Sequence, residues 1–269
     1  MRCRLTYWPC LSLTLLGLTA PTLADPYADS VVDFDLGTGG SSGFTDPTAV
    51  LGEPTRFTAP TSPFGGAVTP FNPPFGADEI LSLGEGGFIT VAFDDPINDD
   101  AANPFGIDLL VFGNALFTLQ SGGVAGVVAN EGGIIEVSAN GTEFFTINGV
   151  DADGLFPTNG YNDSTEAFPS EAGDEPSDFT KPVDPSFNAS GKTLAEILAG
   201  YDGSGGGAGV DISSTGLSSI SYVRISNPVG AGVNPEIDAF ADVVPEPTTL
   251  VLLTAGFVAV TARRRGQTF

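Results

Sequence analysis

Short apolar segments, each bounded by glycine, proline, asparagine or aspartate, recur along the middle of this 269-residue chain. They are rich in β-branched and aromatic residues and too short for typical helices, which is the pattern of β-strands. Only residues 193–199 have helical character. The even spacing of the segments predicts an all-β fold, an antiparallel β-sandwich of the jelly-roll type over about residues 30–243. The predicted strands are residues 87–94, 106–113, 133–140, 142–148, 218–227 and 236–244.

The same segments predict the core and the connections. Residues 106–113 are almost continuously apolar and suit a central strand, and Asn140-Gly141 predicts a two-residue hairpin turn. Residues 157–185 predict a long polar excursion from the sheets, and residues 203–209 predict a flexible loop. The predicted core positions are Val91, Phe93, Leu110, Phe112, Ile135, Val137, Val223, Ile225, Ile237 and Phe240.

The N-terminal residues 1–24 have the three parts of a secretory signal peptide in the right order. Arg2 and Arg4 precede a short apolar stretch, which is followed by a small-x-small cleavage site. Cleavage is therefore predicted between Ala24 and Asp25.

Residues that the mature chain lacks exclude several kinds of chemistry. Both cysteines lie in the predicted leader, and the chain has no histidine. Disulfides, histidine-based zinc sites, Ser-His-Asp triads and Cys-His pairs are excluded together.

The charge of the mature region is strongly negative. All 33 acidic residues but only four of the nine basic ones lie between residues 25 and 247, which leaves a formal charge of −29. Such a surface repels nucleic acid, so no nucleic-acid partner is expected. The charge serves solubility, or some carboxylates converge on a structural calcium ion, which prefers oxygen ligands. The first candidate metal ligands are those of the densest acidic cluster, Asp94, Asp95, Asp99 and Asp100, which solvation alone would also explain.

The C-terminal segment combines an apolar stretch with a basic end. Residues 248–262 would form a helix of roughly 22 Å, short for a bilayer core of about 30 Å but adaptable to it by thinning. Arg263, Arg264 and Arg265 follow and favour a cytoplasmic C-terminus. The sequence thus predicts a short transmembrane helix that holds an exported precursor in the membrane.

The same C-terminal residues resemble a known sorting signal. Val244-Pro245-Glu246-Pro247, the apolar stretch and the arginines together resemble the PEP-CTERM signal of exported bacterial proteins. The resemblance implies that an exosortase-type membrane enzyme recognises Pro245, Glu246 and Pro247 and processes the tail. It divides the chain into a signal peptide (1–24), an extracellular β-sandwich domain (25–243) and a sorting region (244–269).

The central domain has a second resemblance, over about residues 50–243. Residues 83–94, 106–114, 135–141, 222–225 and 236–240 are similar to segments of discoidin-like, or galactose-binding-like, jelly rolls of bacterial surface proteins. The resemblance implies ligand binding at loops on one end of the sandwich and a structural calcium ion. Because the mature chain lacks tryptophan, a sugar-stacking platform would have to be tyrosine or phenylalanine.

Three functions are compatible with these features. The first is a non-catalytic surface protein with a binding or extracellular-matrix role, for which glycan or exopolysaccharide is the partner considered. The second is an enzyme that acts on extracellular glycan through two carboxylates. The third is a purely structural envelope protein without a small ligand.

Overall fold

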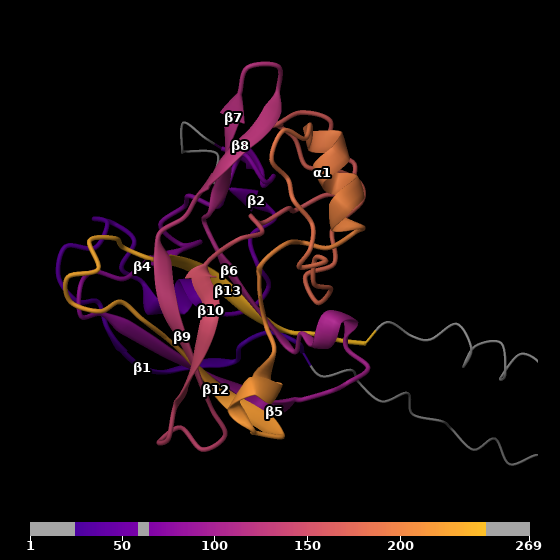
Figure 1. The fold of residues 1–269 in the computed structure, drawn as a ribbon. Coiled ribbons are helices and arrows are strands. Elements are labelled where there is room, and N and C mark those ends of the chain that lie inside the picture. Colours follow the sequence, from indigo (N-terminus) through magenta and orange to yellow (C-terminus); the bar gives the residue numbers. More distant parts are fainter. Residues whose placement is uncertain (1–24, 59–64, 246–269) are drawn as a thin grey trace, which may run out of the picture.

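The computed structural model describes residues 25–58 and 65–245, and most of these residues belong to antiparallel strands or the loops between them (Figure 1). The larger sheet has the strand order β1-β5-β12-β9-β10. Its strands are β1 (Ser30–Asp35), β5 (Phe88–Asn98), β12 (Ser219–Ser226), β9 (Gly132–Ser138) and β10 (Phe145–Asp153).

The second sheet has the order β11-β6-β13-β4, and two short hairpins lie outside both sheets. Its strands are β11 (Ala208–Val210), β6 (Leu109–Gly113), β13 (Glu236–Asp242) and β4 (Leu81–Ser82). The hairpins pair β2 (Phe57–Thr58) with β3 (Gly66–Ala67) and β7 (Leu116–Gln120) with β8 (Val124–Ala129). The described residues also form three 3-10 helices, η1 (Pro47–Val50), η2 (Pro104–Gly106) and η3 (Ile212–Thr215).

The two main sheets pack face to face around a shared apolar core. Val91 and Val223 of the larger sheet lie in one cluster with Val111 and Phe240 of the smaller sheet. All ten predicted core positions are buried, with exposed fractions of 5% or less. The predicted antiparallel β-sandwich is confirmed, and its architecture fits a jelly roll.

The prediction that residues 106–113 contain a central strand is also confirmed. β6 lies between β11 and β13, and all five of its residues are buried. Leu109 and Val111 face the main core, whereas Phe112 lies in a second cluster, where its ring centroid is 5.3 Å from that of Phe179. Part of the predicted excursion 157–185 therefore covers the outer face of this sheet.

The predicted helix is present as α1 (Leu194–Tyr201). Thr193 caps its N-terminus in a reciprocal arrangement with Glu196, which satisfies backbone N–H groups that the first turn leaves unpaired. Ile197 and Tyr201 bury one face of α1 against a cluster that includes Phe156 and Phe117.

Two local predictions were wrong in detail. β9 and β10 do form a hairpin, but Phe145 pairs with Val137, so the connection is longer than two residues. The Asn140 carboxamide oxygen accepts bonds from the backbone N–H groups of Thr142 and Glu143, which stabilises this wider turn. Residues 204–208, predicted as part of a flexible loop, are buried and lead directly into β11.

The two ends of the described chain lie side by side. Tyr27 bridges to Ala241, and the Asp242 N–H donates to the Pro26 carbonyl at 2.7 Å. Within residues 25–58 and 65–245, no helix has the length and apolarity needed to cross a membrane. The predicted membrane span 248–262 and signal peptide 1–24 lie outside the described residues.

Candidate functional site

The outer face of the larger sheet carries an arginine at its centre. Along β12, buried residues alternate with half-buried ones, so that Tyr222, Arg224 and Ser226 face outward. Arg224 lies opposite Thr90 of β5 on one side and Glu136 of β9 on the other. The register of three strands thus fixes a cation, a hydroxyl and a carboxylate in one row.

Two phenylalanine rings and one hydrogen bond hold the Arg224 side chain. Its Cζ lies 3.9 Å from the ring centroid of Phe144 and 5.3 Å from that of Phe88. Its Nε donates to Thr90 Oγ1 at 2.9 Å. Within the described residues, we find no hydrogen-bond acceptor for its two terminal nitrogens. The guanidinium is therefore fixed in place with donors to spare.

A cleft of about 300 Å³ lies beside this arginine. Glu136 Oε2 accepts a hydrogen bond from Ser226 Oγ at 3.2 Å, and in the described structure it forms no ion pair with Arg224. The cleft therefore offers donors and an acceptor on neighbouring strands with space between them. We call it the arginine cleft; its lining residues are Gly86, Gly87, Phe88, Glu136, Arg224, Ser226, Asn227 and Pro228.

The predicted metal ligands are distributed differently from expectation. Asp94 and Asp95 lie within β5 and are exposed, whereas the prediction placed them in a connection. Asp99 and Asp100 do follow the strand. The structure brings Asp99 together with Asp108 and Asp211, whose carboxylate oxygens lie within 4.8 Å of one another. We call these three residues the acidic cluster.

Each member of the acidic cluster has a distinct environment. Asp108 is fully buried and accepts bonds from the backbone N–H groups of Asp100 and Ile212 and from the Asn103 amide. Burial raises the pKa of Asp108, and the negative charge of Asp99 raises it further. Asp211 is exposed and caps η3 by accepting from the Ser213 N–H at 2.8 Å.

A fourth carboxylate lies near the acidic cluster. Burial raises the pKa of Asp242 to about 7, and the charge of Asp108 contributes to the rise. Sequence analysis missed Asp108 and Asp211. A single aspartate inside the apolar run 106–113 was the available signal for Asp108, because a buried charge needs a partner.

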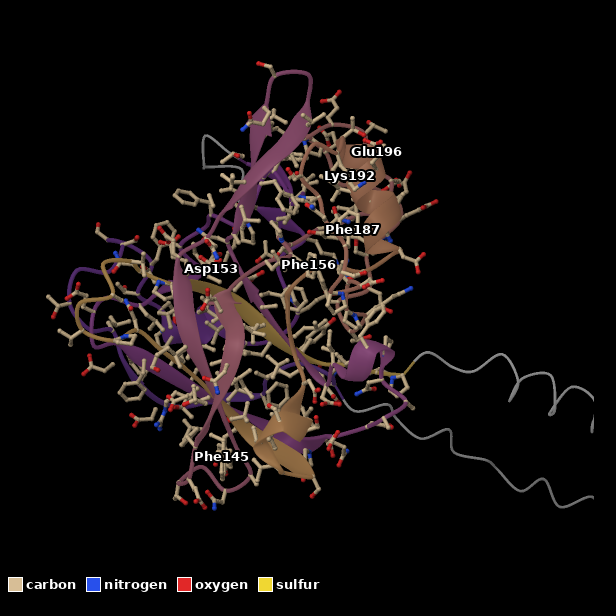
Figure 2. All side chains as sticks on the ribbon, viewed as in Figure 1. Phe145, Asp153, Phe156, Phe187, Lys192 and Glu196 are labelled. Atoms are coloured by element: carbon tan, nitrogen blue, oxygen red, sulfur yellow. The ribbon has the colours of Figure 1, made fainter. Side chains whose placement is uncertain are left out.

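Another group of carboxylates is buried at one end of β10. Asp153 lies at the opposite end of this strand from Phe145, as Figure 2 shows. Its oxygens accept from the backbone N–H groups of Ala115 (2.8 Å) and Glu131 (3.0 Å). Burial raises the pKa of Asp153 to about 7, with smaller contributions from Glu131 and Glu236. Asp153 is fully buried and does not line the arginine cleft, and its two accepted hydrogen bonds tie residues 115 and 131 to the end of β10.

The remaining predicted site residues lie at the edges of the described chain. Asp25 is exposed and Pro245 is half-buried. Ala24, Glu246, Pro247, Arg263, Arg264 and Arg265 lie outside the described residues.

Comparison with known proteins identifies the C-terminal region. Residues 243–265 match the PEP-CTERM protein-sorting motif. No curated protein matches the chain. The match confirms the predicted PEP-CTERM signal, and the motif indicates an exported protein of the cell envelope that an exosortase processes.

Proposed function

We propose that the chain is a surface protein whose β-sandwich is a non-catalytic binding module for neutral polysaccharide of the extracellular matrix. The observation that carries this proposal is the arginine cleft. Arg224 is held between two rings with its terminal nitrogens unbonded within the described residues, and Glu136 lies beside it without pairing.

The chemistry of the cleft suits sugar hydroxyl groups. A hydroxyl both accepts and donates, so neighbouring hydroxyls of one sugar can bond to Arg224 and to Glu136 at once. Because Phe144 and Thr90 already hold the guanidinium, binding costs little further side-chain entropy. A neutral glycan is favoured over an acidic one, since the mature region carries a formal charge of −29.

The path of the chain supports attachment at one point. Pro26 and Asp242 are hydrogen-bonded neighbours, so the sorting region begins close to where the mature chain enters the domain. The sandwich would extend from the membrane on one stem, with the apolar segment 248–262 as its anchor before processing. The same proposal includes a relationship of this jelly roll to discoidin-like domains.

Replacing Arg224 should weaken glycan binding. On a glycan array, the unaltered protein is expected to retain one class of neutral polysaccharide. Arg224→Ala and Arg224→Lys should weaken binding at least tenfold, or about 1.4 kcal/mol, because lysine lacks the planar fork. Lys192→Ala removes the same charge at a position that lies beside Phe187 and does not line the arginine cleft. It should leave binding unchanged. Undiminished binding by Arg224→Ala would place the ligand elsewhere.

The alternative functions predict different results with the same material. Cleavage of a bound polysaccharide into shorter products would identify an enzyme and overturn the non-catalytic role. A complete lack of glycan binding would favour a purely structural envelope protein.

Processing of the tail should be visible in the mass of the surface product. In a host with an exosortase, mass spectrometry is expected to find a C-terminus near Pro245-Glu246-Pro247. An intact C-terminal Phe269 would instead indicate a permanent anchor, and recovery of the chain in the soluble cytosol would contradict both forms of export.

A further inference from the structure

We propose that Asp99, Asp108 and Asp211 hold a calcium ion that ties the two sheets together, with Asn103 as a further oxygen ligand. The proposal goes beyond glycan binding and does not depend on the arginine cleft. It moves the calcium site from the continuous stretch 94–100 to residues from three separate segments.

The acidic cluster joins parts of the chain that come from different sheets. Asp99 follows β5 of the larger sheet, whereas Asp108 precedes β6 of the smaller sheet. Asp211 follows β11, and the Asp108 N–H donates to the carbonyl of Val210, the last residue of that strand, at 2.8 Å. An ion shared by these three carboxylates would fix the connection from β5 to β6 against the edge of the second sheet.

A buried amide supplies independent evidence for a ligand at this place. Asn103 is 5% exposed, and its Nδ2 donates to Asp108 Oδ1 at 2.9 Å. Its Oδ1 is buried and has no hydrogen-bond partner in the described part of the chain. This oxygen is bonded to the same carbon as the Nδ2 that contacts Asp108, so it lies close to that member of the acidic cluster. The Oδ1 atoms of Asn72, Asn159 and Asn227 are also buried without a partner among the described residues, but only Asn103 contacts an aspartate of the acidic cluster. Buried amide oxygens normally have a partner, and a side-chain carbonyl is a common calcium ligand.

The charges at the cluster also require compensation. A fully buried carboxylate without a counter-charge is strongly unfavourable. The ion pairs of the described residues join Arg56 to Glu53 and Lys181 to Asp202, so neither includes a member of the cluster. Asp242 adds a further carboxyl close to Asp108.

The hydrogen bonds of the acidic cluster leave carboxylate oxygens available for an ion. Asp108 accepts three hydrogen bonds from protein groups, which leaves part of its lone-pair capacity unused. Asp211 uses Oδ1 to cap η3, so Oδ2 is available. Asp99 and Asp211 are exposed, whereas Asp108 is buried, so the acidic cluster reaches solvent through two of its three members.

The donor set selects calcium among the common cations. All ligands are oxygens, they differ in burial, and they come from loops as well as a strand end. Calcium accepts irregular oxygen coordination and several waters, whereas magnesium demands near-ideal octahedral geometry. Zinc prefers nitrogen and sulfur ligands, which the cluster does not contain.

Calorimetric titration of the full chain with CaCl2, at constant ionic strength, tests the proposal. One ion per chain is expected, and it should raise the melting temperature more than NaCl of equal ionic strength does. The variant Asp99→Asn with Asp211→Asn should lose at least tenfold in calcium affinity. It should still fold, because Asp99 is exposed and asparagine caps a helix as well as aspartate does.

The matched control is Asp94→Asn with Asp95→Asn. It removes the same charge from exposed positions of β5 and should change calcium affinity by less than about twofold. Equal losses in the two double variants would mean diffuse attraction of cations and would overturn the site. The absence of calcium-specific heat, or identical melting shifts from CaCl2 and NaCl, would overturn it as well.

Discussion

Asp238→Asn is expected to stabilise the protein at neutral pH. It should also reduce the extra stability that the protein gains when the pH is lowered to mildly acidic values. Asp238 is 2% exposed, and burial raises its pKa to about 7, with a smaller contribution from the charge of Glu79. Its oxygens accept from the backbone N–H of Thr55 at 3.0 Å and from the Thr55 hydroxyl at 2.9 Å. Asparagine can keep both contacts, because its oxygen accepts from the N–H and its amide donates to the hydroxyl.

The direction of the pH dependence follows from linkage. The folded state binds a proton at Asp238 up to about pH 7, whereas the unfolded chain releases it near the usual aspartate pKa of 3.8. Stability from the neutral carboxyl is therefore complete below about pH 4 and is lost as the pH rises to about 7. A rise of the Asp238 pKa from 3.8 to about 7 corresponds to about 4 kcal/mol of unfolding free energy, and Asp238→Asn should recover a large part of it at pH 7.5.

Denaturant unfolding at several pH values between 4 and 8 measures this effect. The unaltered protein should be more stable at pH 5 than at pH 7.5, and the curve of Asp238→Asn should be flatter. Asp153→Asn is an informative contrast, because Asp153 accepts from two backbone N–H groups and an asparagine would turn a donor toward one of them. It should lose stability at pH 5, where the Asp153 carboxyl is neutral, whereas at pH 7.5 removal of the buried charge offsets part of this loss. Parallel curves for Asp238→Asn and the unaltered protein would show that Asp238 does not control the pH dependence.

The sandwich and its core could be predicted because they depend on local periodicity. Val223 and Ile225 alternate with outward residues on β12, and a continuous apolar run identified β6 as a strand with both faces buried. The helical character of residues 193–199 likewise identified the helix at Leu194–Tyr201, although its cap at Thr193 was not predicted. Each of these signals lies within a few residues of the element that it forms.

The candidate sites depend on contacts between distant residues, which no local pattern encodes. Asp99, Asp108 and Asp211 meet only because β6 pairs with β11 and the β5–β6 connection returns to that edge. The arginine cleft likewise requires the register of β12 against both β5 and β9. Sequence density favoured Asp94 and Asp95, but the strand extends through them and directs them into solvent.

The glycine-rich stretch 203–209 also depends on contacts with distant residues, which the sequence did not reveal. These contacts lead to a large predicted effect of mutation. Gly206→Ala is expected to destabilise the protein by about 3–5 kcal/mol. Gly206 has a φ of +86°, and an added Cβ would lie 2.5 Å from the Pro157 carbonyl oxygen and 2.9 Å from that of Phe156. Both obstacles are backbone atoms, so a side-chain rotation cannot relieve the clash.

Moving the backbone at residues 156–157 would break contacts of the apolar cluster that packs against α1. The Gly207 N–H donates to the Phe156 carbonyl at 2.8 Å, and the Tyr201 hydroxyl donates to the Pro157 carbonyl at 3.0 Å. Tyr201 is 1% exposed, so its hydroxyl would lose its partner inside the protein. The substitution would therefore also disturb the packing of α1, which carries Tyr201.

Gly203→Ala separates this steric effect from the cost of the backbone conformation. Gly203 has the same φ of +86°, but the nearest atom to an added Cβ is Asn162 Nδ2 at 4.0 Å. Only the left-handed strain remains, which costs about 1–2 kcal/mol for a residue with a side chain. Thermal unfolding should thus rank the unaltered protein, Gly203→Ala and Gly206→Ala in order of decreasing stability. Equal losses in both variants would mean that residues 204–208 can yield as a flexible loop would, and that the contacts of Phe156 and Pro157 do not fix them.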